Sequence, residues 1–265
     1  MDHSVLRRSV TGSLVEIAAT NLRRGRDDVA IFEIGKGYGD DAGVVREWWR
    51  LAILLTGAAE EPAWNRPQRS FDLDDAKGVI ELVCRRLGFA APSWSPLADE
   101  PLLHPGRAAR VIVERAASDG RPTVALSGVL GELHPLVADA VDVRGARLIV
   151  AELDVAGLAG GQVEDRRASA PSRHPASERD LAVVVGATVP AAAIEAAIRS
   201  AAGERLVGLR LFDIYRGAPL AADEKSVNWR LIFQAPDRTL TDAELDGAVA
   251  SVTTALAALG GRIRT

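Results

Sequence analysis

The C-terminal third of the chain carries the pattern that most restricts what it can fold into. β-branched runs, alternating apolar and polar residues, and amphipathic stretches follow one another in the order strand, helix, strand, strand, helix, strand. The predicted strands cover residues 180–185, 206–215, 226–234 and 262–265, and the predicted helices cover 190–202 and 241–259. This order predicts a ferredoxin-like βαββαβ fold, in which two helices cover one face of the sheet and the other face is open.

Local signals within this region support the assignment. The stretch 226–234 alternates, so that Trp229 should face the helices while Asn228 and Arg230 should face away from them. The segment Thr241-Asp-Ala-Glu244 has the spacing of a capping box, a signal for the start of a helix. The elements are therefore predicted from independent features of the sequence.

The preceding part of the chain has a less regular order of elements. Helices are predicted at 4–24, 72–87 and 135–140, and strands at 29–34, 50–56, 108–115, 123–130 and 148–153. Because they do not follow a regular βαβ period, they favour an α+β fold with a mixed or antiparallel sheet. The Gly-rich segment 35–39 is predicted to end the first strand, and residues 117–120 are predicted to form a hairpin turn.

A segment between the two parts differs from both in composition. Residues 157–172 are rich in Gly, Ala, Arg, Asp and Ser and show no periodicity, which is typical of a linker. We therefore divide the chain into a first domain at 1–156, a linker at 157–172 and a second domain at 173–265.

Composition is that of a soluble globular protein, with 48% hydrophobic and 26% charged residues. The net charge of −4 argues against a generally basic nucleic-acid-binding protein but permits a local basic surface. One cysteine, Cys84, excludes a disulfide framework and any Cys-rich metal site. No apolar run approaches the ~20 residues that cross a bilayer. We predict a cytoplasmic protein with no membrane contact.

The residue types that usually carry catalysis do not form a recognisable site. His104, His134 and His174 each precede a proline, which is typical of turns, and none has a second His or Cys at ligand spacing. The Gly-rich segment Phe32–Gly39 lacks the phosphate-loop pattern and a following helix. Cys84 lies beside an apolar helical stripe, as a buried hydrophobe would. The sequence therefore predicts no catalytic and no metal-binding residue.

The open sheet face of the second domain is the candidate binding surface. Residues 173–265 hold eleven basic and eleven acidic residues, and nearly all the basic ones are arginine, which can pair with phosphate and stack on bases. Tyr215 ends a neighbouring strand, where it could stack on a base near Asn228 and Arg230. The neutral charge balance slightly favours a solvated polar surface instead. A regulatory or small-ligand-binding module without RNA contact also fits these residues.

Several motifs in fixed order nevertheless resemble one family, the β subunit of bacterial phenylalanyl-tRNA synthetase. The second domain is similar to its ferredoxin-fold anticodon-binding domain through Ser177-Glu-Arg-Asp-Leu-Ala-Val183, Leu211-Phe-Asp-Ile-Tyr-Arg-Gly217, Glu224-Lys-Ser-Val-Asn-Trp-Arg-Leu231 and Ala235-Pro-Asp-Arg-Thr-Leu-Thr-Asp242. The first domain is similar to the preceding catalytic-like module through Ser4-Val-Leu-Arg7, Asn21-Leu-Arg-Arg-Gly25, Ile31-Phe-Glu-Ile-Gly35, His104-Pro-Gly-Arg107 and Gly128-Val-Leu-Gly-Glu-Leu-His-Pro135. The resemblance covers nearly the whole chain.

The resemblance implies that the first domain is a degenerate relative of class II synthetase cores that has lost its chemistry. A Phe-Arg-x-Glu motif is missing, and Phe32-Glu-Ile-Gly35 stands where it could have decayed. In this family the α subunit activates phenylalanine with ATP and Mg²⁺ and transfers it to tRNA, within an (αβ)₂ heterotetramer. This chain would then bind no cofactor itself and would support the α subunit.

The resemblance further implies that the second domain contacts the anticodon stem-loop of tRNA-Phe, with no role for DNA. We predict that Tyr215, Arg216, Asn228 and Arg230 lie near the tRNA. Arg179 is a further candidate, although it could instead anchor the start of its strand. Nothing resembles the N-terminal oligonucleotide-binding and editing modules of full β subunits. The chain is therefore expected to be a C-terminal piece of a β subunit or a truncated gene product.

Overall fold

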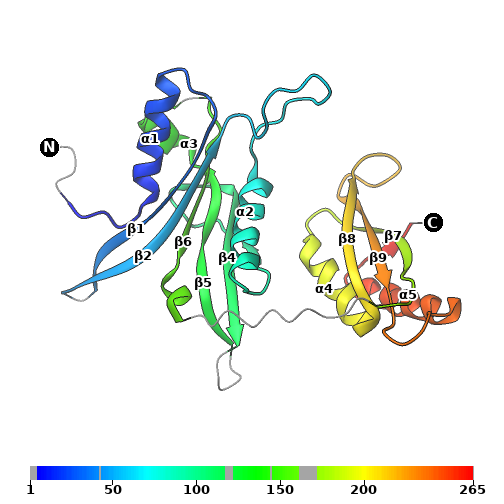
Figure 1. Cartoon of the computed structure of the whole chain (residues 1–265). Coiled ribbons are helices and arrows are strands. Elements are labelled where there is room, and N and C mark those ends of the chain that lie inside the picture. The colour runs from blue at the N-terminus through cyan, green and yellow to red at the C-terminus, as the bar shows by residue number, and fades with distance from the viewer. Residues whose placement is uncertain (1–4, 42, 117–121, 144, 161–171, 265) are drawn as a thin grey trace. The chain divides into compact units, whose positions relative to one another are not determined.

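Figure 1 shows the computed structural model of the chain, which describes residues 5–41, 43–116, 122–143, 145–160 and 172–264. The chain divides into two compact units, Met1–Arg166 and Arg167–Thr265. Each unit contains its own sheet and its own buried apolar core. None of the described helices combines the length and apolarity needed to cross a membrane.

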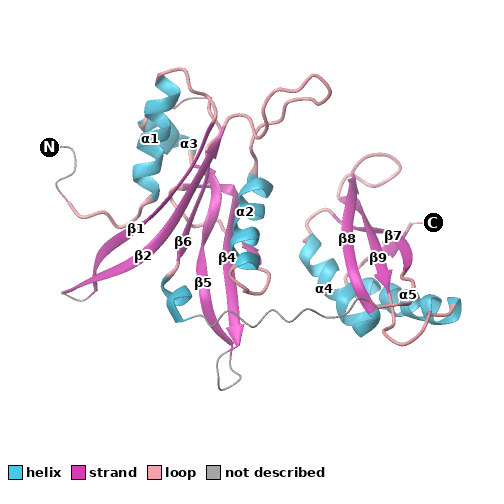
Figure 2. Cartoon of the chain, in the orientation of Figure 1, coloured by secondary structure: helices cyan, strands magenta, loops and turns pink. Residues whose placement is uncertain are grey.

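The first unit is built on one antiparallel sheet, with its strands in the order β1-β2-β6-β5-β4-β3. Its strands are β1 (Val29–Asp41), β2 (Val44–Thr56), β3 (Ser93–Pro96), β4 (Leu103–Ala116), β5 (Pro122–Leu133) and β6 (Ile149–Asp154). Its helices are α1 (Thr11–Arg23), α2 (Leu73–Arg86) and α3 (Pro135–Ala140), followed by the 3₁₀ turn η1 (Ala156–Gly160). Figure 2 shows these helices beside the sheet. The predicted α+β class is confirmed.

Helices cover both faces of this sheet, which therefore has two apolar layers. On one face Leu54 packs in the cluster that contains Leu14 of α1. On the other face Ile53 packs in the cluster that contains Ile80 of α2. Because neighbouring strand residues point to opposite faces, burial on both sides requires the continuous apolar run 51–55 in β2.

The prediction that the glycines of 35–39 end the first strand is wrong. β1 runs through them to Asp41, in unbroken register with β2. A Cβ atom at Gly37 or Gly39 would overlap the indole ring of Trp48, and at Gly37 also the carbonyl oxygen of Arg8. Glycine here makes room for a large ring and a crossing chain, a role it often has inside strands.

Other boundaries differ from the prediction by more than the one or two residues by which element ends usually vary. α1 begins at Thr11 rather than at residue 4, β2 begins at Val44 rather than at residue 50, and β3 was not predicted. The predicted hairpin turn at 117–120 lies outside the described residues, although β4 and β5 on either side of it do pair.

The second unit has the predicted ferredoxin-like order. Its elements are β7 (Ser177–Gly186), α4 (Ala191–Ala202), the 3₁₀ turn η2 (Gly203–Arg205), β8 (Leu206–Tyr215), β9 (Glu224–Phe233), α5 (Asp242–Ala257) and β10 (Arg262–Ile263). The sheet order is β10-β7-β9-β8, and every pairing is antiparallel. Ile194 of α4 and Val252 of α5 pack with Leu231 and Phe233 of β9 in one core. The helices therefore lie on one face of the sheet.

Two helices begin at the capping residues that their sequences indicate. Thr241 caps α5 and Glu244 returns a bond to the Thr241 backbone, which confirms the predicted capping box. Asp72 and Asp75 form the same arrangement at α2. Each box satisfies backbone N–H groups that have no partner within the helix. These local interactions fix where the helices start.

Candidate nucleic-acid interface

The open face of the second sheet is formed by alternate residues of its strands. In β9, Trp229 and Leu231 are buried against the helices, whereas Asn228 and Arg230 are partly exposed on the other side. Residues paired across antiparallel strands share a face, so Tyr215, opposite Ser226, also lies on the open face. Three of the five residues predicted to contact RNA thus share one surface.

Arg230 is held in place by acidic neighbours on that surface. Its guanidinium donates two hydrogen bonds of 2.8 Å to the Asp180 carboxylate, and Glu178 lies 3.5 Å away. The hydrogen bonds from Arg230, followed by its positive charge, keep the pKa of the Asp180 carboxyl below its usual value. The guanidinium also lies 5.6 Å from the ring centroid of Phe212. Arg230 is therefore oriented but already charge-paired.

Tyr215 presents an exposed ring beside a second arginine. Its hydroxyl donates a 2.6 Å hydrogen bond to the carbonyl of Ala218, which fixes the ring. The guanidinium of Arg264, which follows β10, lies 5.7 Å from the ring centroid. Arg264 is joined to β7 by a backbone hydrogen bond to Ala182, so its side chain crosses the sheet toward β8. The Tyr215 ring and the Arg264 guanidinium therefore lie together on the open face.

The structure does not bring Arg179 to this surface. Arg179 alternates with Asp180, so it faces the helix side of β7, where it bonds Asp242 at the start of α5 at 3.2 Å. This fits its other predicted role as a structural anchor. Arg216 is exposed just after β8. The pKa of Lys225 is lowered mainly by burial and to a smaller extent by the positive charge of Arg216. Arg216 thus belongs to the end of the strand rather than to the centre of the face.

Sequence reasoning missed Arg210, Phe212 and Arg264. Arg210 of β8 lies opposite Arg230 of β9 in the strand register, so both are on the open face. Arg210 is exposed and makes no ion pair with the described residues. The alternation of β8 could have pointed to Arg210, but a bulge between Leu211 and Asp213 shifts the pattern beyond it. Arg264 lies beside Tyr215 because β10 pairs with β7. This pairing joins segments far apart in the chain, so no local sequence pattern predicts the contact.

Acidic and amide groups complete the open face. Asn228 donates a 2.9 Å hydrogen bond to the Asp213 carboxylate and its amide oxygen accepts one from Ser226. The surface therefore combines exposed rings, arginines and carboxylates rather than a single block of positive charge. Such a surface suits stacking and hydrogen bonding more than bulk electrostatic attraction.

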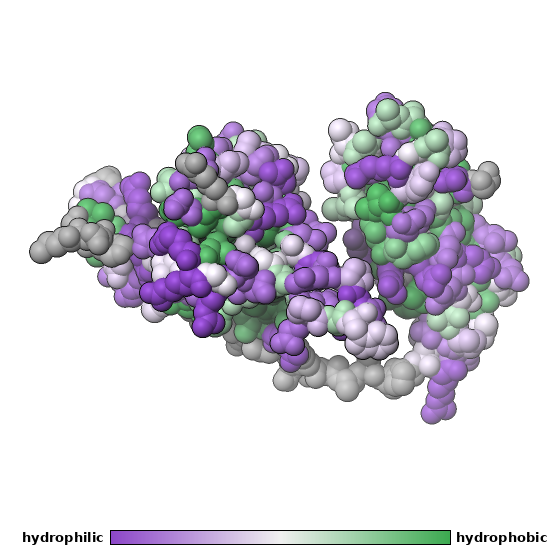
Figure 3. All heavy atoms as spheres, turned by 90° about the horizontal axis from the view of Figure 1, so that it is seen from above, coloured by the Kyte–Doolittle hydropathy of each residue, from purple (hydrophilic) through white to green (hydrophobic). Residues whose placement is uncertain are grey.

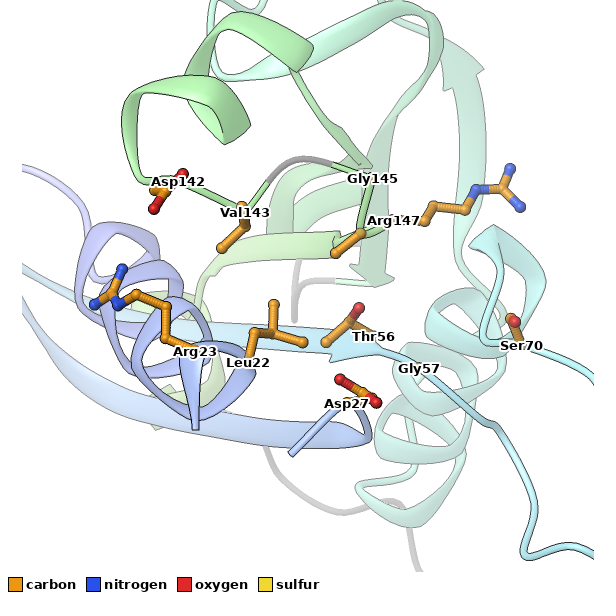
Figure 4. A pocket seen from close by; sticks show the side chains of 11 residues that line it. Leu22, Arg23, Asp27, Thr56, Gly57, Ser70, Asp142, Val143, Gly145 and Arg147 are labelled. Carbon is orange, nitrogen blue, oxygen red and sulfur yellow. The ribbon is translucent and has the colours of Figure 1, made fainter. Parts of the chain in front are cut away.

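The first unit has a wide cavity of about 530 Å³ but no catalytic constellation in it. Leu22, Asp27 and Thr56 lie together across from Val143, while Arg147 extends away from them (Figure 4). Arg147 is directed to Glu132, with which it forms a 3.0 Å bond. No nucleophile is paired with a base among the described lining residues, and no cluster of described residues has the composition of a metal site.

Comparison with known proteins separates the same two parts. Residues 1–155 match the family model described as "Phenylalanyl tRNA synthetase beta chain CLM domain". Residues 172–264 match the model described as "Ferredoxin-fold anticodon binding domain". The chain belongs to the phenylalanyl-tRNA synthetase beta chain family. The resemblance found in the sequence motifs is confirmed.

Individual members of the beta chain family match over nearly the whole of this chain. The phenylalanine–tRNA ligase beta subunit of Moorella thermoacetica is 40% identical over 257 residues, which is 96% of this chain and 30% of the relative. The corresponding subunit of Symbiobacterium thermophilum is 37% identical over 100% of this chain and 29% of its own length. The chain thus spans about three tenths of the length of these relatives.

Proposed function

We propose that this chain is part of the beta subunit of a phenylalanine–tRNA ligase and that its second unit binds the anticodon stem-loop of tRNA-Phe. The observation that carries the proposal is the exposed ring of Tyr215 beside the Arg264 guanidinium, on an open sheet face. The match of this unit to an anticodon-binding family and the names of the relatives support it.

The binding energy comes mainly from stacking rather than from charge. A base that stacks on Tyr215 contributes ~1–3 kcal/mol, and Arg264 can cover a second base plane or pair with a phosphate. Arg230 is already paired with Asp180, so it has little net charge to offer the RNA backbone. Few counterions are then released, and the salt dependence of binding is shallow.

The first unit has a supporting role in this proposal. It packs against an alpha subunit, which uses ATP and Mg²⁺ to activate phenylalanine, in an (αβ)₂ assembly in the cytoplasm. A groove between the N-terminal segment and α1 supports such a contact, because Val5 and Leu6 are exposed there by 83% and 67%. Failure to co-purify with an alpha subunit of the same organism would argue against this part of the proposal.

Binding of an anticodon stem-loop RNA by the full chain tests the central claim. We expect Tyr215→Ala to weaken affinity about tenfold or more, because stacking is lost, while Tyr215→Phe keeps the ring and most of the affinity. Arg264→Ala should also weaken binding. Fluorescence anisotropy with labelled RNA at two salt concentrations gives both the affinity and its salt dependence.

Arg199→Ala is the matched control, because Arg199 lies on α4, on the helix side of the sheet, and pairs with Glu195. It should leave RNA affinity unchanged. Equal affinities for the Tyr215→Ala, Arg264→Ala and Arg199→Ala variants would contradict the proposal.

A regulatory or small-ligand-binding module without RNA contact is the second candidate. The acidic groups of Glu178, Asp180 and Asp213 on the open face favour it, since they repel phosphate. Calorimetry of the same chain against the stem-loop RNA and against free amino acids separates the two. Heat from an amino acid, with none from RNA, would select this second candidate.

A further inference from the structure

The arginines of the second unit differ in whether a carboxylate balances their charge. Several form ion pairs, which are Arg179–Asp242, Arg199–Glu195, Arg205–Glu244, Arg230–Asp180, Arg238–Glu244 and Arg262–Glu224. Arg264 lies against the Tyr215 ring. Arg210 of β8 is exposed, and within the described part of the chain no ion pair, side-chain hydrogen bond or ring contact includes it. Arg210 therefore carries an unbalanced charge.

Arg210 lies on the open face at the edge of the sheet. It is opposite Arg230 in the register of β8 and β9, and β8 has a neighbouring strand on one side only. Gly208, two residues earlier on the same face, has no side chain that would cover it. The Arg210 guanidinium can therefore be reached both from above the open face and from the sheet edge.

The carboxylates of the open face are already engaged by other groups. Asp180 accepts two 2.8 Å hydrogen bonds from Arg230, Glu178 lies 3.5 Å from the same guanidinium, and Asp213 accepts from an amide of β9 at 2.9 Å. Asp180 and Glu178 also belong to β7, two strands from Arg210, and this spacing of ~10 Å is about the distance over which salt screens charges. Like charges opposite each other destabilise a sheet, so the position of Arg210 opposite Arg230 brings no gain to the fold. An anion from outside the chain is the partner that this charge lacks.

An arginine in this position suits a phosphate. Its guanidinium presents parallel N–H donors that match two oxygens of one phosphate. RNA supplies a phosphate at every nucleotide, and Tyr215, the stacking residue of the proposed function, lies on the same strand and the same face. Because of a bulge in β8, the residues opposite Arg210 and Tyr215, which are Arg230 and Ser226, are four residues apart on β9. The two side chains are therefore ~13 Å apart along the strand, which is longer than the span from one base to its own phosphate.

We propose that Arg210 binds a backbone phosphate of the RNA, while Arg230, which Asp180 holds, binds none. The inference rests on the proposed function and assigns a second contact to it. Tyr215 stacks on one base, and Arg210 pairs with the phosphate of a neighbouring nucleotide, so the RNA strand runs along β8. On the side of the second unit that Figure 3 shows, hydrophilic residues are interspersed with hydrophobic ones, as expected where phosphate contacts are single.

A base edge is the other group of RNA that an arginine can bind. Guanine offers it two acceptors, O6 and N7, with the same two-donor geometry. Reading a base requires a guanidinium that is held in one plane, as Asp180 holds Arg230. No such bond holds Arg210 in the described part of the chain. A phosphate, which presents oxygens in several directions, is therefore the better match.

The first part of the test measures binding of a labelled anticodon stem-loop RNA to the full chain over a series of salt concentrations. We expect Arg210→Gln to weaken binding about tenfold at low salt. It should also make the slope of log affinity against log salt shallower by ~0.7, the value for one phosphate of a single strand. Arg210→Lys keeps the charge and should keep the slope, with a smaller loss of affinity. Arg199→Gln removes the same charge from the helix side and should change neither quantity.

The second part replaces the loop phosphates of the RNA one at a time by a neutral methylphosphonate, which leaves the bases in place. We expect one such replacement to weaken binding to the unaltered chain and to have no further effect on Arg210→Gln, because both changes remove the same contact. The same replacement should still weaken binding to Tyr215→Ala, since stacking is a separate contact. Arg210 makes no bond within the described chain, so the melting temperature of Arg210→Gln should not fall.

Three results would overturn the inference, and they differ in what else they overturn. Unchanged affinity and slope in Arg210→Gln, with weaker binding by Tyr215→Ala, would reject the phosphate contact and leave the proposed function standing. Coupling of Arg210→Gln to a base substitution, and to none of the methylphosphonates, would assign Arg210 to a base edge instead. A full chain that binds no stem-loop RNA at all would reject the proposed function together with this inference.

Discussion

At the scale of single residues, one carboxylate organises the start of α1. Glu152 of β6 accepts hydrogen bonds from the Ser9 hydroxyl at 2.5 Å, the Val10 and Thr11 amides at 3.0 Å, and the Thr11 hydroxyl at 2.7 Å. A negative charge at a helix N-terminus is also favourable. We expect Glu152→Ala to lower the free energy of unfolding of the first unit by about 2–3 kcal/mol, measured by urea denaturation.

Glu132→Ala is the matched control for this prediction. Glu132 lies at the partly exposed end of β5 and forms ion pairs with Arg107 and Arg147. Surface ion pairs of this kind contribute about 0–1 kcal/mol. An effect of Glu152→Ala no larger than that of Glu132→Ala would show that the carboxylate does not hold the helix.

Residues whose position follows from local alternation could be predicted from the sequence, whereas residues whose partners are distant in the chain could not. Arg230 and Asn228 were assigned to the open face correctly, because alternation along a strand is a local property. Glu152 was not singled out, since its partners lie more than 140 residues away along the chain. Gly37 was misread for the same reason, because the ring and the chain that need the space come from other segments.

At the scale of elements, the short strand β10 depends on an ion pair with the start of β9. Arg262 binds the Glu224 carboxylate through both guanidinium nitrogens, one of them at 2.9 Å. This hydrogen bonding, with a backbone bond from Ala221, lowers the pKa of Glu224 from 4.5 to about 2. The stabilisation is therefore complete above about pH 4.5 and is lost as the pH falls toward 2.

We therefore expect Glu224→Gln to lower the melting temperature of the second unit at neutral pH and to have a diminishing effect as the pH falls from about 5 to 2. Thermal unfolding followed by circular dichroism at a series of pH values measures this difference. Glu195→Gln, which removes the exposed pair with Arg199 on α4, is the control and should show little change. A Glu224→Gln effect that is independent of pH would contradict the assignment.

Elements whose signals are local were predicted well, and those that depend on partners were not. The capping box at Thr241 predicted the start of α5, and the range of β8 was predicted to the residue. β3 has only four residues and forms by pairing with β4, so no periodicity marks it. The start of β2 was missed because Val44–Trp49 pairs with the glycine-rich half of β1.

At the scale of the whole molecule, the two units have separate apolar cores. The cluster around Phe233 draws all its residues from the second unit, and the clusters around Leu54 and Ile80 draw theirs from the first. Cooperative unfolding is carried by a shared core, so units without one unfold separately. We divided the sequence at a linker, residues 157–172, from their composition, and those boundaries stay a prediction.

We expect thermal unfolding of the full chain to show two transitions that respond to different core substitutions. Leu54→Ala and Leu231→Ala each remove a fully buried side chain, and each should destabilise its own unit by about 2–5 kcal/mol. Leu54→Ala should lower only the transition of the first unit, and Leu231→Ala only that of the second. Scanning calorimetry of the three proteins measures both transitions. A single transition, or a shift of both transitions by one substitution, would show that the two units unfold as one cooperative unit.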